Sequence, residues 1–308
     1  MLFNSSGVQI GTGARDLNPL EMHQYSGVVT QLGGDGANGT KDDYLVVSTT
    51  TGGARIATYA AVIDQVTNDP RTILPVTLGN LGANATWLLP SSAHLQGANG
   101  AFYTTDLTIA NTDASTATVT LKFLGHDQDG TSGAERTQTI PASSEVTYSD
   151  VLNSVFGLSE DYGAILVTSG SLNVKVLSQT STPTPGSVGT FGQSVPSSGP
   201  ADWVNLAAPK TLIGLRNDTS FRTNVVIANA TGKSAHVDLA LVSEGSGALW
   251  SSGVDLQPYE MHQVSYLDLP TGFANAALTV STTTPGARIA TYAAIIDQVT
   301  NDPRTVLP

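Results

Sequence analysis

The feature that most constrains this sequence is a long internal repeat. Residues 48–75 and residues 281–308 are related by an offset of 233 and are identical at 25 of 28 positions. Upstream, Pro19–Gln24 matches Pro258–Gln263 at all positions but one, with an offset of 239. The differences within the long repeat are Gly52/Pro285, Val62/Ile295 and Ile73/Val306. Self-similarity of this kind predicts a tandem array of one structural unit.

A weaker match places the remaining chain in the same scheme. Tyr103–Asn111 aligns with Phe221–Asn229 through the shared pattern aromatic-x-Thr-Asp/Asn-apolar-x-Ile-Ala-Asn. We therefore predict three units, residues 1–76, 77–200 and 201–308, called here the first, middle and last units. The first unit matches the last unit only from about residue 241 onward, so residues 201–240 have no counterpart in it.

The pattern of apolar residues predicts strands. Residues 117–124 and 236–241 alternate with period two, and Gly- and Asp-containing turns separate such runs. Arg55–Asp64 is apolar on both faces, which predicts a strand in the interior between two sheets. A short helix is expected near Ser149–Phe156, with Ser149 as its N-cap. Short strands at this spacing predict an all-β protein of tandem β-sandwiches with an incomplete first unit.

Composition excludes several classes of protein. Charged residues make up 12% of the chain, which is too few for the solvent-exposed faces of a coiled coil. Hydrophobic residues make up 40%, which is enough for a core. A net charge of −12 without a basic cluster disfavours nucleic acid and anionic membrane surfaces. No apolar run is long enough for membrane insertion, and the absence of cysteine excludes disulfides. The Ser/Thr/Asn/Gly-rich, Lys-poor sequence is typical of a secreted or cell-surface protein, although its first residues lack a secretion signal.

The repeated motifs resemble those of a known class. The motifs at Tyr103–Asn111, Phe221–Asn229, Gly53–Pro70 and Gly286–Pro303 resemble tandem immunoglobulin-like β-sandwich repeats of secreted bacterial proteins. The resemblance implies adhesive, spacer or carbohydrate-facing modules and names no catalytic residue. The middle unit departs from the pattern, because residues 171–181 lack the Arg, the Tyr and the terminal Asp.

A catalytic interpretation rests on the repeated Glu-Met-His-Gln and Asp-Gln-Val-Thr-Asn-Asp-Pro-Arg segments. His23 and His262 occupy one repeat position, and Asp64 and Asp297 another. A histidine oriented by a carboxylate can act as a general base, so His23 with Asp64, or His262 with Asp297, would form a hydrolase site. A metal-dependent hydrolase site in the same segments is the other form of this hypothesis. The alternative is a pair of histidines on a solvated sheet surface. The chain has no Gly-x-Ser-x-Gly motif.

Clustered aspartates are candidates for calcium, which prefers oxygen ligands. The alternative for each cluster is a turn in which the carboxylate accepts backbone N–H groups. Asp127-Gln128-Asp129-Gly130 lacks the distal Glu of an EF-hand, which favours a hairpin turn. The metal candidates are Asp64, Asp69, Asp297 and Asp302 in the repeat, Asp127 and Asp129 in the middle unit, and Asp35, Asp42 and Asp43 in an insertion of the first unit.

The functional hypothesis follows from these features. We expect a non-catalytic extracellular adhesion, display or spacer module, with calcium as a stiffening ion and carbohydrate or another surface protein as partner. Aromatic residues are only 6% of the chain, and Trp250, after a hairpin, is the candidate sugar platform. The hydrolase is the alternative. An incomplete sandwich exposes sheet edge and core, so we expect the middle unit or a second copy, as in a homodimer, to cover the first unit.

Overall fold

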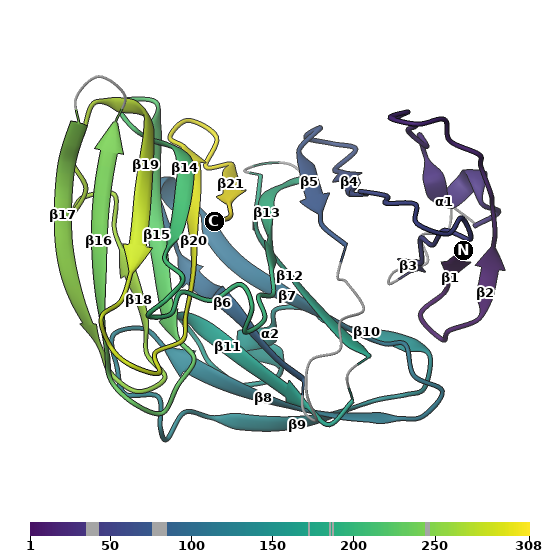
Figure 1. Ribbon diagram of the computed structural model, residues 1–308, viewed down its shortest axis with the longest axis horizontal. Helices are drawn as coiled ribbons and strands as arrows, with labels where there is room; N and C mark the ends of the chain where they lie inside the picture. Colours follow the sequence, from purple (N-terminus) through teal and green to yellow (C-terminus); the bar gives the residue numbers. More distant parts are fainter. Residues whose placement is uncertain (35–42, 76–84, 172, 185, 187, 244–246) are drawn as a thin grey trace.

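The computed structural model describes residues 1–34, 43–75, 85–171, 173–184, 186, 188–243 and 247–308. The regular secondary structure of these residues is almost entirely β-strand, as the sequence predicts (Figure 1). The helical segments among them are α1 (Val28–Gln31), α2 (Val151–Ser154) and the 3-10 turn η1 (Ala98–Gly100). No helix in the described ranges has the length and apolar character needed to span a membrane.

The last unit consists of two antiparallel sheets that enclose one core. Its strands are β14 (Lys210–Asn217), β15 (Phe221–Asn229), β16 (Ala235–Ser243), β17 (Gly247–Leu256), β18 (Met261–Val264), β19 (Phe273–Ser281), β20 (Ile289–Asp297) and β21 (Pro303–Val306). The two sheets have the orders β14-β19-β16-β17 and β18-β15-β20-β21. Buried residues of both sheets, such as Val237 and Ile295, form one apolar cluster. The alternation along each strand places these residues on the inward face.

The middle unit repeats this strand order. Its strands are β6 (Ala85–Gln96), β7 (Phe102–Asn111), β8 (Ala117–Gly125), β9 (Glu135–Ile140), β10 (Ser144–Tyr148), β11 (Asp161–Ser169), β12 (Val174–Pro183) and β13 (Thr190–Pro196). The orders β6-β11-β8-β9 and β10-β7-β12-β13 match the last unit strand for strand. The difference is β6, which pairs with β11 and, at its end, with β7, so that the strands join into one eight-stranded sheet.

The aromatic-to-Asn motif has a structural role at the end of β7 and β15. Asn111 and Asn229 are fully buried, and each side-chain amide donates hydrogen bonds to backbone carbonyls. For Asn229 the acceptors are Lys233 O at 2.7 Å and Gln257 O at 2.9 Å. Because a buried amide is costly unless it is hydrogen-bonded, these contacts fix the loops around it.

The helix of the middle unit is shorter than predicted and is not capped by Ser149. The N-cap residue is Asp150, with a φ of 48° and no side-chain cap bond. Its carboxylate instead lies 2.8 Å from His94 Nδ1. Val151 and Leu152 are fully buried in the core of the middle unit. Packing rather than capping therefore holds this single turn.

The first unit keeps the strand registers of the last unit. Its strands are β1 (Leu2–Phe3), β2 (Gln9–Gly11), β3 (Tyr44–Leu45), β4 (Ala60–Ile63) and β5 (Pro70–Ile73). Leu2 pairs with Leu45 as the equivalent Leu241 pairs with Leu278. Ala60 pairs with Ile73 as Ala293 pairs with Val306. The order β2-β1-β3 thus corresponds to β17-β16-β19, and β4-β5 to β20-β21.

Burial separates the two copies of the repeated segment. Tyr292 in β20 is 3% exposed, whereas its equivalent Tyr59 is 71% exposed. Val62 on β4 is 49% exposed, and its equivalent Ile295 is 1% exposed. The predicted interior strand is correct for the last unit and wrong for Arg55–Asp64, because no counterpart of β15 pairs with β4 among the described residues.

A second apolar cluster joins the middle and last units. Leu88, Leu124 and Leu166 on the outer face of β6, β8 and β11 meet the outward face of β15, β18 and β20. On β20 this face carries Ala290, Tyr292, Ala294 and Ile296. The strand is therefore buried on both sides, with alternate residues in two different cores. In Figure 1 the last unit stands upright on the left, and the strands of the middle unit cross beneath it.

The unequal burial leads to a matched pair of substitutions. We expect Ile295→Ala to lower the free energy of unfolding by about 2–5 kcal/mol, because it leaves a cavity in a closed core. The equivalent Val62→Ala should change it by less than about 0.5 kcal/mol, because Val62 lies at the surface. Urea unfolding followed by circular dichroism measures both. Equal losses would show that β4 is buried as β20 is.

Candidate functional site

Three ligand-type side chains meet where the middle and last units join. Asp127 follows β8, and Glu260 and His262 lie at the start of β18. One carboxylate or imidazole atom from each lies within 4.8 Å of the others. His262 Nδ1 is 2.5 Å from Asp127 Oδ1. Two residues that the sequence assigned to different kinds of site, Asp127 and His262, therefore belong to one cluster.

The backbone of both units fixes this cluster. Asp127 N–H donates to Met261 O at 2.8 Å, and Gly130 N–H donates to Pro258 O at 2.8 Å. Asp127 has a φ of 52°, a left-handed conformation that is uncommon outside glycine, asparagine and aspartate. A Cβ on Gly130 would lie 2.2 Å from Tyr259 O, so only glycine allows this approach. The turn after β8 therefore has a backbone conformation that lets it pack closely against the last unit.

The donor set suits a transition metal better than calcium. Glu260 is buried and accepts the Gln257 N–H at 2.6 Å, while His262 supplies an imidazole nitrogen. Calcium takes oxygen ligands, whereas zinc and similar ions bind imidazole and carboxylate together. Asp129 does not join the cluster: its carboxylate accepts the Thr131 N–H at 2.8 Å, which lowers its pKa. The chain there forms a turn, as the favoured interpretation predicts.

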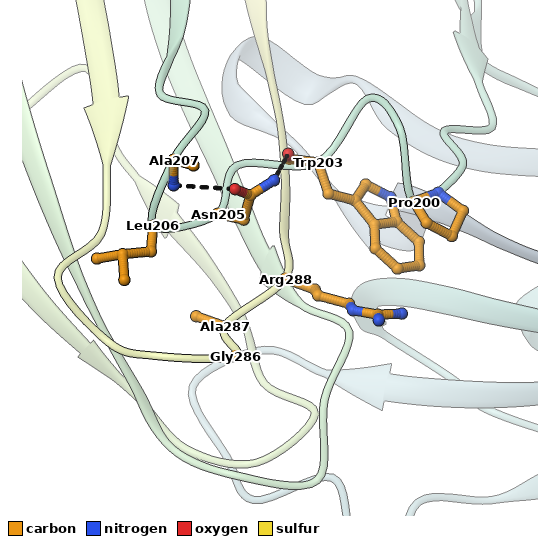
Figure 2. Close-up of a pocket in the computed structure, with 8 residues that line it drawn as sticks. All are labelled: Pro200, Trp203, Asn205, Leu206, Ala207, Gly286, Ala287 and Arg288. Atoms are coloured by element: carbon orange, nitrogen blue, oxygen red, sulfur yellow. Dashed lines mark hydrogen bonds between the residues drawn. The ribbon is translucent and has the colours of Figure 1, made fainter.

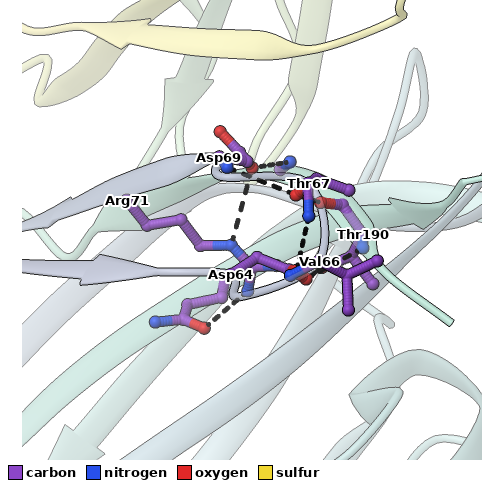
Figure 3. A network of polar contacts seen from close by, with 8 residues as sticks. Asp64, Val66, Thr67, Asp69, Arg71 and Thr190 are labelled. Carbon is purple, nitrogen blue, oxygen red and sulfur yellow. Dashed lines mark hydrogen bonds and ion pairs between the residues drawn. The ribbon is translucent and has the colours of Figure 1, made fainter.

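The first repeated acidic turn binds β13 of the middle unit. Asp64 accepts the N–H groups of Val66 and Thr67 through one oxygen and the Thr190 N–H through the other (Figure 3). These hydrogen bonds hold the pKa of Asp64 far below its usual range. Asp69 is buried, accepts the Gly192 N–H at 2.8 Å and lies 4.0 Å from the Arg71 guanidinium.

The second acidic turn lies close to the first. Asp297 accepts the N–H groups of Val299 and Thr300, of which the Thr300 bond contributes most to lowering its pKa. Burial, together with the nearby carboxylates of Asp69 and Asp297, raises the pKa of Asp302 to about 6. Thr305 Oγ1 donates to Ser194 O on β13 at 2.7 Å. Both copies of the repeated segment therefore contact β13 of the middle unit, the first through its turn and the second through β21.

The predicted histidine–aspartate pairs do not form. On β15, His262 is paired with Ile227 and Asp297 is paired with Phe221. These two partner positions are six residues apart along β15. At about 3.3 Å per residue they lie roughly 20 Å apart along the strand. His23 is exposed and contacts the Tyr25 ring edge-on, whereas Asp64 is bound to Thr190. In the last unit the two repeat positions therefore lie at opposite ends of the sheet formed by β18, β15 and β20.

The other sequence candidates lie elsewhere. Asp35 and Asp42 fall outside the described residues, and Asp43 is half-buried. Trp250 is on β17, opposite Leu241, and packs partly against the core of the last unit. The ring is therefore only partly available as a platform for sugar.

Sequence reasoning missed a pocket of about 350 Å³ between residues 200–207 and residues 286–288 (Figure 2). Its lining residues are Pro200, Trp203, Asn205, Leu206, Ala207, Gly286, Ala287 and Arg288. Trp203 is buried and donates through Nε1 to Ser198 Oγ at 2.9 Å. Asn205 closes a local turn by accepting the Ala207 N–H at 3.0 Å. The contributing segments are about 80 residues apart, so no local motif could indicate the pocket.

Comparisons with known proteins add little. No family model and no curated protein matches the chain. The crystal structure of Thermotoga maritima 1070 is similar over 39% of this chain and 97% of its own, with 20% identity and a TM-score of 0.29. A similarity at that TM-score supports no statement about fold or function.

The raised pKa of Asp302 predicts a pH dependence. The folded chain keeps this proton up to about pH 6, whereas the unfolded carboxyl releases it near 3.8. The contribution of Asp302 to stability is therefore lost as the pH rises from about 4 to about 6. Asp302→Asn should raise the melting temperature at pH 7 and leave it nearly unchanged at pH 4.

Thermal unfolding at several pH values measures this difference. The exposed Asp16→Asn is the control, because it removes the same charge far from the turn. A gain that is equal at pH 4 and pH 7 would contradict the assigned titration. The lowered pKa values of Asp64 and Asp297 act in the opposite sense and below pH 4, outside this window.

Proposed function

We propose that the chain is a non-catalytic module of tandem immunoglobulin-like β-sandwiches that displays or spaces binding loops in a secreted or cell-surface protein. The observation that carries the proposal is the apolar cluster between the middle and last units. Units joined only by a linker move independently, whereas a hydrophobic interface holds them in one orientation. A fixed orientation is what a spacer or display module requires.

The segment between the two units supports the same function. Leu88 and Ser198 exchange two backbone hydrogen bonds of 2.9 Å, which ties the segment to the middle unit. Val204 and Ile289 exchange two more, of 2.8 and 3.0 Å, which ties it to the last unit. A connection paired at both ends has little freedom to act as a hinge. The Asp127–His262 contact adds a third attachment on the loop after β8.

Carbohydrate or another surface protein is the partner class that we propose for such a module. Trp250 stays the candidate residue for sugar. Calcium stays a prediction as the stiffening ion, and two observations count against it. In the repeated turns backbone N–H groups already occupy the oxygens of Asp64 and Asp297, and at the joint one of three donors is an imidazole.

Hydrolysis is the second candidate function, and one observation favours it. Asp127 orients the imidazole of His262, which is 29% exposed at its side chain. This is the arrangement of a general base with its orienting carboxylate. A hydrolase screen of the chain tests it: turnover that His262→Ala abolishes would establish the enzyme and refute the non-catalytic module.

Rigidity can be tested directly, because the chain has no cysteine and accepts two labels without background. Cysteines at the exposed positions Thr137 and Ser251 carry spin labels on the middle and last units. We expect a single narrow distance distribution by electron–electron double resonance. Ala294→Arg places a charge in the apolar joint and should broaden that distribution.

The matched control is Ala61→Arg. Ala61 is the equivalent residue of the first unit and is exposed, so the distribution should stay narrow. Circular dichroism shows whether Ala294→Arg leaves the strands folded. A broad distribution in the unsubstituted chain would overturn the proposal of a rigid module.

A further inference from the structure

The first unit exposes surface that the last unit covers. β20 pairs with β15 along its whole length, from Ile289 opposite Asn229 to Asp297 opposite Phe221, and with β21 over Ala293–Ile296. β4 pairs with β5 alone among the described residues. Accordingly the strand shrinks to Ala60–Ile63, and the preceding residues are not in a strand. The two strands differ only at Val62/Ile295, so the missing neighbour accounts for the difference.

The exposed surface is apolar and already in register. Ile56 and Val62 correspond to Ile289 and Ile295 of the closed core, and they are 47% and 49% exposed. The pairs Leu2–Leu45 and Ala60–Ile73 reproduce the registers of the last unit. The missing counterparts are β14, β15 and the part of β16 before Leu241. An apolar face beside an open strand edge is the surface to which an added strand binds.

We infer that the first unit is a docking site for a β-hairpin of the β14–β15 type, supplied from outside residues 1–308. The second strand of that hairpin pairs with β4 and points alternate apolar residues inward, as Val225 and Ile227 do in the last unit. A buried asparagine equivalent to Asn229 closes the loop that follows. Main-chain hydrogen bonds provide affinity, and the alternating apolar residues provide register.

Neither the middle unit nor a second copy supplies this hairpin. In the middle unit, β7 already has β12 on one edge and β10 and β6 on the other. In a second copy, Leu212, Leu215, Val225 and Ile227 are fully buried in its own last unit. Withdrawing them would open an equal apolar face there, so the exchange gains nothing. The expected homodimer is therefore an outcome of the test rather than the proposal.

The test adds the hairpin in two ways. In one, residues 201–239 are fused ahead of Met1, because the offset of 239 places Met1 at the position of Ala240. In the other, a peptide of residues 205–239 is added to the full chain. Hydrogen exchange of the Ile56–Ile63 amides should slow by about 100-fold on docking, since the edge becomes a paired strand. Titration of the peptide should give one site per chain.

Two matched controls separate docking from nonspecific adhesion. A hairpin with Val225→Asp and Ile227→Asp should give no protection, because it would place carboxylates in the core. Val62→Asp in the full chain should abolish protection while leaving the melting temperature of the unbound chain unchanged, since Val62 is exposed. Protection in both formats supports a hairpin from a separate chain, and protection in the fusion alone supports a covalently linked one.

Three results would overturn the inference. One is the absence of protection in both formats. Another is equal protection by the aspartate-substituted hairpin. The third is self-association in sedimentation equilibrium that protects the Ile56–Ile63 amides without any hairpin, which would identify a second copy as the occupant. The spin-label distances between the middle and last units are independent of all three.

Discussion

The central interaction in this protein is the burial of β20 on both faces. Ile289, Ala293 and Ile295 close the core of the last unit, and Ala290, Tyr292, Ala294 and Ile296 pack against the middle unit. One strand thereby belongs to two cores, and its alternate residues join the last unit to the middle unit. Burial raises the pKa of Tyr292 to about 12, so its hydroxyl stays neutral within the joint. Because β20 closes the core of the last unit and also packs against the middle unit, a short linker is enough to join the two units.

Short polar side chains, rather than ion pairs, hold the loops of this protein in place. With 12% charged residues, ion pairs are few in the described part of the chain, and the loops there are instead fixed by amides, hydroxyls and carboxylates that bind backbone groups. Asn111 and Asn229 secure the loops after β7 and β15, and Asp64 and Asp297 close the repeated turns. Such bonds are local and directional, so a repeated sequence segment forms the same bonds in each copy. This is consistent with a repeat in which loop geometry survives while the burial around it changes.

The sequence predicts what depends on neighbours along the chain. Strands and the aspartate turns follow from alternation and from residue types. It does not predict contacts between distant residues, such as Asp127 with His262, which are 135 positions apart. Nor does it predict that Arg55–Asp64 is exposed, because the same residues are buried in the last unit. The cause lies in the absence of a pairing strand, which no local pattern records.

The two acidic turns show how one motif serves two positions. Both copies of the repeated segment contact β13: Asp64 and Asp69 in the first turn bind Thr190 and Gly192, and Thr305 on β21, after the second turn, binds Ser194. The first unit is therefore attached through its turn, and this attachment does not involve the exposed edge of β4. The Asp69 carboxylate also raises the pKa of Asp302, so the first turn affects the charge of the second. Because the anchor and the open edge are separate, the first unit presents that edge in a defined orientation, which is the geometry that strand addition requires.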